Sequence, residues 1–158
     1  MNEQERVDFF KKQITLEKDI VTAAQASVEG LENKIVRELI LGIALDSNKH
    51  ASLLTALTAS VEGKNPLISE KITDRLKKNL ETHIELENKA IQTYQDLMGH
   101  LEDEKEKLIV KFILNDEIRH HKLLKQLHSM IVEKETITEE ELWDTLWGDA
   151  LWSGTPGG

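Results

Sequence analysis

One stretch in the last third of the chain decides the predicted fold: residues 108–131, which read LIVKFILNDEIRHHKLLKQLHSMI. Its apolar residues recur at a spacing typical of a helix with one buried face, namely Leu108, Ile109, Ile113, Leu124, Leu127 and Ile131. Glu117 and His120 interrupt this face near its middle. Because residues i and i+3 lie on one side of a helix, these two side chains can bind one metal ion together.

Three more apolar stripes of helical spacing precede this one, over residues 7–28, 36–61 and 76–98. Each is interrupted by polar residues, which are Glu17 in the first, Ser47 and His50 in the second, and Glu87 in the third. The composition also suits helices, since aromatic residues make up 4% of the chain and it contains only 2 Pro and 8 Gly. We therefore predict an all-α four-helix bundle with a polar layer inside. Buried unpaired carboxylates are costly, and a divalent cation would offset that cost.

The four stripes form two similar halves, because the sequence repeats itself at an offset of 70 residues. Among the identical residues that this offset aligns are Glu17 with Glu87, Asp46 with Asp116, and His50 with His120. Leucines and glutamates can align by chance in helices, whereas aligned histidines and aspartates are harder to explain in that way. Ser47 aligns with Glu117, so one carboxylate lacks a counterpart. The repeat predicts two helical hairpins.

Central ligands in matched repeats require the second and third helices to run parallel, so the chain must cross the bundle between them. The segment EGKNP, residues 62–66, marks the start of this crossover. The crossover cannot span the bundle if the third helix continues unbroken from Ser69. We therefore expect a break near Thr73 to Leu76. We assign the bundle to residues 1–134, and a short C-terminal helix with a flexible tail to residues 135–158.

Charge and cysteine content exclude several classes of protein. The formal net charge is -9 and no basic stripe is present, so we expect no nucleic-acid partner. Without cysteine, a transition metal must be held by His, Asp or Glu. No apolar run approaches ~18 residues, so we expect no membrane partner. The N-terminus is acidic and polar, unlike a secretory signal, and a cytoplasmic location is the expectation.

Residues 116–120, DEIRH, resemble the Asp-Glu-x-Arg-His signature of the ferritin-like di-iron carboxylate superfamily. The pattern Glu87-x-x-Ala90-x-x-x-Tyr94 is similar to the third helix of its rubrerythrin-like branch, and residues 46–50, DSNKH, resemble a degraded copy of the signature. The resemblance covers about residues 8 to 132. It implies a ferritin-like four-helix bundle of two hairpins with a crossover. The cysteine-ligated iron module of rubrerythrins is absent from this chain.

The resemblance also implies a role for each residue of the polar layer. Glu17 and Glu87 would be terminal ligands, His50 and His120 would be nitrogen ligands, and Glu117 would bridge two metal ions. The implied cofactor is iron, at two ions per chain, with manganese or zinc as alternatives. Other residues would surround these ligands: Asp46 and Asp116 orienting the histidines, Tyr94 near the site, and Ser47 leaving a coordination position open.

Two functions of different classes follow from this pattern. The resemblance implies ferroxidase or peroxidase activity on dioxygen or hydrogen peroxide, in iron oxidation or oxidative-stress protection. The alternative is a non-catalytic, metal-stabilised bundle that binds a partner protein through its C-terminal tail, which contains Trp143, Trp147 and Trp152. A polar layer can also serve only to fix helix register. We expect a homodimer or a larger homo-oligomer.

Three further histidines lie close to the predicted ligands in sequence. His83 comes one turn before Glu87, and it is either an extra ligand or second-shell group, or a residue at the rim of the site. His121 and His128 are expected to lie on the outside of the bundle.

Overall fold

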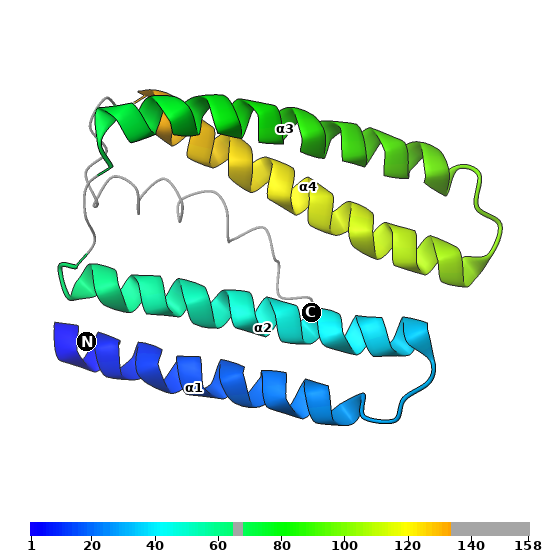
Figure 1. Cartoon of the computed structure of the whole chain (residues 1–158), viewed down its shortest axis with the longest axis horizontal. Coiled ribbons are helices and arrows are strands. Elements are labelled where there is room, and N and C mark those ends of the chain that lie inside the picture. The colour runs from blue at the N-terminus through cyan, green and yellow to red at the C-terminus, as the bar shows by residue number, and fades with distance from the viewer. Residues whose placement is uncertain (65–67, 134–158) are drawn as a thin grey trace. The chain divides into compact units, whose positions relative to one another are not determined.

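The computed structural model of this chain describes residues 1–64 and 68–133. Four helices occupy most of these residues, namely α1 (Glu3–Ser27), α2 (Lys34–Val61), α3 (Glu70–Met98) and α4 (Glu104–Glu133). No strand occurs in the described ranges, which confirms the all-α class and the four helices predicted from the apolar stripes. None of these helices is long and apolar enough to cross a membrane. The chain divides into two compact units, Met1–Leu67 and Ile68–Gly158, which contain one helical hairpin each (Figure 1).

The first unit is an antiparallel hairpin of α1 and α2 (Figure 1). A capping box starts α1, in which the Asn2 side chain accepts from Glu5 N and the Glu5 side chain accepts from Asn2 N. Asn33 caps α2 by accepting from Val36 N at 3.1 Å. The core of this hairpin consists of small or branched apolar side chains, namely Val7, Ala24, Val28, Ala44 and Ala51.

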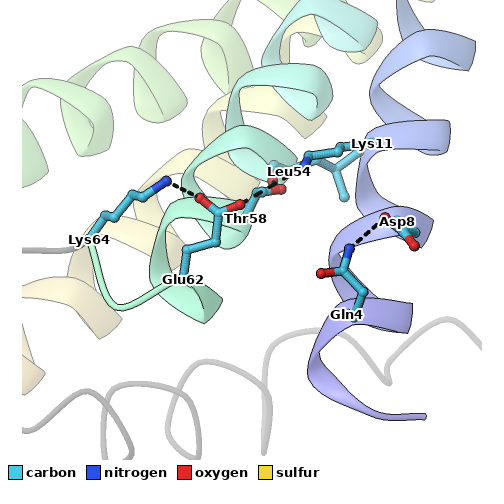
Figure 2. A network of polar contacts seen from close by, with 7 residues as sticks. All are labelled: Gln4, Asp8, Lys11, Leu54, Thr58, Glu62 and Lys64. Carbon is cyan, nitrogen blue, oxygen red and sulfur yellow. Dashed lines mark hydrogen bonds and ion pairs between the residues drawn. The ribbon is translucent and has the colours of Figure 1, made fainter.

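Polar contacts join the start of α1 to the end of α2 (Figure 2). Lys11 of α1 and Lys64, just beyond α2, both approach the carboxylate of Glu62, and Lys11 Nζ lies 4.0 Å from Glu62 Oε1. The hydrogen bond from Lys64 is the main reason that the pKa of Glu62 is lowered. All of these side chains are partly or well exposed, so we expect the contacts to fix the pairing of the two helix ends more than to add stability.

The second unit is a hairpin of α3 and α4. Its helices are antiparallel, because Glu81 near the start of α3 pairs with His128 near the end of α4 at 3.3 Å. Asp103 caps α4, since its Oδ1 accepts from Lys105 N at 2.8 Å and Glu106 N at 3.1 Å. The buried apolar side chains among the described residues of this hairpin are Leu80, Met130 and Ile131.

The expected break near Thr73 to Leu76 is wrong, because α3 runs unbroken from Glu70 to Met98. Locally the sequence contains nothing to interrupt it, since neither Gly nor Pro occurs inside this helix. The break was inferred from the distance that a crossover must span. The helix-forming residues at the start of α3 keep it continuous instead.

Several predictions fall on residues outside the described ranges. They concern the short C-terminal helix and flexible tail of residues 135–158, with Trp143, Trp147 and Trp152. The crossover between the hairpins includes residues 65–67, which also lie outside the described ranges. The parallel course of α2 and α3 therefore stays a prediction.

Two glycines of the first unit, Gly30 and Gly42, give opposite predictions for substitution by alanine. Gly30 follows α1 with φ +70, where an alanine is strained, whereas Gly42 lies inside α2 with open space around its Cβ position. We expect Gly30→Ala to lower the free energy of unfolding by about 1 kcal/mol. We expect Gly42→Ala to raise it by about 0.5–1 kcal/mol, because alanine is the better helix former. Urea unfolding followed by circular dichroism measures both, and a destabilised Gly42→Ala would contradict the open space.

Candidate metal centre

The second unit brings three of the predicted ligands together. Glu87 lies on α3, Glu117 and His120 lie on α4, and one ligand atom from each is within 4.8 Å of the other two. His120 Nδ1 is 3.6 Å from Glu117 Oε2. The i, i+3 spacing turns both α4 side chains toward the same side of the helix. We call these three residues the triad, and their half-buried nitrogen and oxygen donors are a set that can hold a metal ion.

The charges within the triad favour a cation. The neighbouring Glu87 carboxyl is the main reason that the pKa of Glu117 is raised above its usual value of 4.5, and burial raises it further. The attraction of His120 acts in the opposite direction with less weight. Two carboxylates held this close repel each other unless one of them takes up a proton. A bound cation would attract both carboxylates and take the place of that proton.

Glu87 has one oxygen with a partner and one without. Its Oε1 lies 3.1 Å from Nε2 of His83, one turn earlier on α3. Its Oε2 is buried and meets no hydrogen-bond donor in the described part of the chain. A buried carboxylate oxygen without a donor costs free energy, and a metal ion at the triad would offset that cost. The donor set and this unpartnered oxygen therefore fit a metal ion.

The first unit carries a related but smaller group. Glu17 on α1 and His50 on α2 pair across the hairpin, with 3.3 Å between Glu17 Oε1 and His50 Nδ1. Glu17 Oε2 is buried and, like Glu87 Oε2, has no hydrogen-bond partner within the described ranges. Ser47 precedes His50 by three residues and is 5% exposed. A serine therefore occupies the position that matches Glu117 in the other hairpin, and the first unit offers a pair of ligands where the second offers three.

Each hairpin thus contributes its own share of the predicted ligand set. Glu17 and His50 are paired in the first unit, and Glu87, Glu117 and His120 are gathered in the second. The convergence of all five on one site stays a prediction.

The residues predicted to surround the ligands make contacts of their own. Asp116 Oδ1 accepts from Arg119 at 2.6 Å, and Asp46 Oδ1 accepts from Lys49 at 2.5 Å, one turn along the same helix in each case. Tyr94 is half-buried on α3, two turns beyond Glu87. The orientation of the histidines by Asp46 and Asp116 stays a prediction.

Two histidines of α4 were expected to point outward or to lie at the periphery of the bundle. His121 is partly exposed, and its Nδ1 is buried without a hydrogen-bond partner among the described residues. His128 pairs with Glu81 of the facing helix, and its side chain is 25% exposed. The sequence did not indicate either environment, because both depend on how α4 packs against α3.

Comparison with known proteins identifies a family for this chain. The family model described as Rubrerythrin matches residues 8–128, a range that contains the triad and the Glu17–His50 pair. Neither the curated proteins nor the solved structures gave a match.

Proposed function

Because the chain belongs to the rubrerythrin family, we propose that it binds iron at the triad and reacts there with dioxygen or hydrogen peroxide. The observation that carries this proposal is the triad with its buried, unpartnered Glu87 oxygen. Imidazole and carboxylate ligands suit iron, and they suit manganese and zinc as well, so the family membership is what favours iron.

Specific residues of this chain would bind the metal ions, and one of them would also hold a proton in the metal-free protein. Glu87, Glu117 and His120 would hold one iron ion, and Glu17 and His50 would supply ligands for a second. Iron in such a site supplies one-electron oxidation and reduction with oxygen or peroxide as the oxidant. The raised pKa of Glu117 favours its protonated form in the metal-free chain, and a bound cation would lower that pKa and displace the proton.

The absence of cysteine limits the possible sources of electrons for the reduction of oxygen or peroxide. No thiolate-bound iron can form on this chain, so the electrons would come from ferrous iron itself or from a partner protein. If ferrous iron is the electron donor, the protein is a ferroxidase and ferrous iron is its substrate. If a partner protein is the electron donor, the protein is a peroxidase that protects against oxidative stress.

Metal analysis followed by an oxygen-uptake assay tests the proposal. The protein is purified without added metal, its metal content is measured, and ferrous iron is then added anaerobically before air or peroxide. We expect about two iron ions per chain, as in other carboxylate bundles of this type, and oxygen or peroxide consumption that depends on them. Zinc, or no metal at all, together with no consumption of either oxidant would contradict the proposal. That result would favour the metal-stabilised bundle without turnover.

A further inference from the structure

Helix α2 exposes large apolar side chains on two opposite sides. Ile43 is 57% exposed and Leu45 is 71% exposed. They are two residues apart, so about 200° of helix rotation separates them. Ala44, between them, is buried in the core of the α1–α2 hairpin and marks the side of α2 that packs against α1. One neighbouring surface cannot cover both Ile43 and Leu45.

The side of α2 that contains Ile43 is also the side of its predicted ligand. His50 follows Ile43 by seven residues, which is close to two full turns, so both lie on the same side of the helix. On this side His50 pairs with Glu17 of α1. Whatever completes the metal centre therefore covers Ile43 and His50, and it leaves Leu45 on the opposite side of α2.

The side of α2 that contains Leu45 consists of uncharged residues. Leu41 comes four residues before Leu45, and Ser52 and Ala56 come seven and eleven residues after it, so all four share one side of the helix. We call these four residues the outer face of α2. Leu45, Ser52 and Ala56 are exposed, and Leu41 is half-buried.

The matching surface of α4 is charged where α2 is not. At the offset of 70 residues three lysines of α4 match uncharged residues of α2, and the pairs are Lys111 with Leu41, Lys122 with Ser52, and Lys125 with Thr55. Ile118, an exposed apolar residue of α4, stands among these lysines. The ligand sides are alike in both helices, since Ile43 and His50 match Ile113 and His120. The α4 surface therefore suits water, whereas the outer face of α2 has the composition of a surface that is covered.

The outer face of α2 is complementary to itself. Its first part carries the larger residues Leu41 and Leu45, and its second part carries the smaller residues Ser52 and Ala56. A twofold axis midway between positions 48 and 49 would place Leu45 of each antiparallel copy opposite Ser52 of the other, and Leu41 opposite Ala56. Twofold interfaces require such a self-match, and small residues let two helices approach closely. The Ser52 hydroxyl already donates to Asn48 O at 3.0 Å, so covering it leaves no donor unpaired.

The distribution of charge also favours a second copy of this chain as the occupant of the outer face. The chain has a formal net charge of -9, so two copies repel each other over most of their surfaces. From Leu39 to Val61, the charged residues of α2 are Asp46 and Lys49, which form an ion pair with each other. Lys49 lies next to the twofold axis, and its pairing with Asp46 leaves the centre of the face neutral.

We propose that two copies of this chain form an antiparallel, twofold-symmetric dimer through the outer face of α2. The interface is on the side of α2 opposite His50, so it leaves the ligand side of the helix unobstructed. The dimer therefore depends neither on bound metal nor on the proposed function, and either can fail without the other.

Sedimentation of the full-length chain at micromolar concentrations tests the dimer. We expect twice the chain mass of 18.0 kDa, both with and without a chelator. Leu45→Lys should raise the dimer dissociation constant about 100-fold or more, because it replaces two central leucines by like charges. Asn115→Lys is the matched control at the equivalent exposed position of α4 and should sediment like the wild type. A monomeric wild type, or a dimer that Leu45→Lys leaves intact, would overturn the proposal.

A second variant separates specific packing from general apolar adhesion. Ala56→Phe adds apolar surface to the outer face, but it fills the space that Leu41 of the other copy occupies in the proposed dimer. We expect Ala56→Phe to raise the dissociation constant about tenfold. A tighter dimer would mean that apolar area alone drives association, and it would overturn the proposed pairing.

Introduced cysteines report the antiparallel register directly, because the chain has no cysteine of its own. On mild oxidation, Leu45→Cys chains mixed with Ser52→Cys chains should form a disulfide-linked dimer, since these positions face each other. Each variant alone should cross-link far less, because like positions lie about 10 Å apart along the paired helices, beyond the reach of a disulfide. No cross-linking in the mixture, or equal cross-linking in mixed and unmixed samples, would contradict the register.

Discussion

Glu117→Ala is expected to weaken metal binding at the triad by about 100-fold or more, the largest effect of any single substitution. The change removes one of the three ligands of the triad and one of its two carboxylates. Metal binding should then no longer stabilise the fold. A metal present at 100 times its Kd adds about 2.7 kcal/mol of stability, or roughly 5–10 °C in Tm. Thermal unfolding with and without Zn²⁺ or Mn²⁺ measures this difference, and full metal content in Glu117→Ala would show that Glu117 is not a ligand.

The metal-free protein provides a second measurement at the same residue. Because the pKa of Glu117 is raised in the folded chain, the protonated form is favoured there. The stability that this proton confers is fully present below the unfolded-state pKa, near 4.5, and is lost as the pH rises through the raised folded-state pKa. We expect Glu117→Gln, which carries no charge, to remove this part of the pH dependence in the presence of a chelator. Parallel Tm curves for Glu117→Gln and wild type would show that Glu87 and Glu117 do not interact as inferred.

Ser47→Glu is expected to make the stability of the chain depend on metal. Ser47 is buried on α2, three residues before His50, at the position that matches Glu117 in the repeat. A carboxylate placed there without a cation should cost about 3–5 kcal/mol, or roughly 10 °C in Tm. With metal present, the new carboxylate completes a Glu-x-x-His pair on α2. We therefore expect tighter binding of a second ion and recovery of most of the lost Tm.

Two control variants separate charge from packing at this position. Ser47→Gln adds a similar volume without the charge, so its stability should not respond to metal, and Ser47→Ala should have a small effect. If Ser47→Glu stays destabilised at saturating metal and binds no additional ion, then Ser47 is a packing residue. The hypothesis of a degraded di-metal half-site would then be wrong.

The helices of this protein follow from local sequence. Apolar residues at a spacing of three to four positions predicted all four of them, because helical periodicity depends on neighbours within one or two turns. The same short-range geometry predicted that Glu117 and His120 lie on one side of α4. Where the prediction used a long-range argument instead, as for the break in α3, it was wrong, since no residue in α3 interrupts the helix.

The contacts between helices were decided only by the tertiary structure. The sequence singled out Glu87, but its approach to Glu117 and His120 requires the register of α3 against α4. The raised pKa of Glu117, the contact between His83 and Glu87, and the buried nitrogen of His121 depend on that same register and on side-chain rotamers. A sequence specifies which face of a helix a residue lies on, because that is set by rotation per residue. Distances of a few ångströms between helices are set by the packing of every side chain between them, and so they come from the folded hairpin alone.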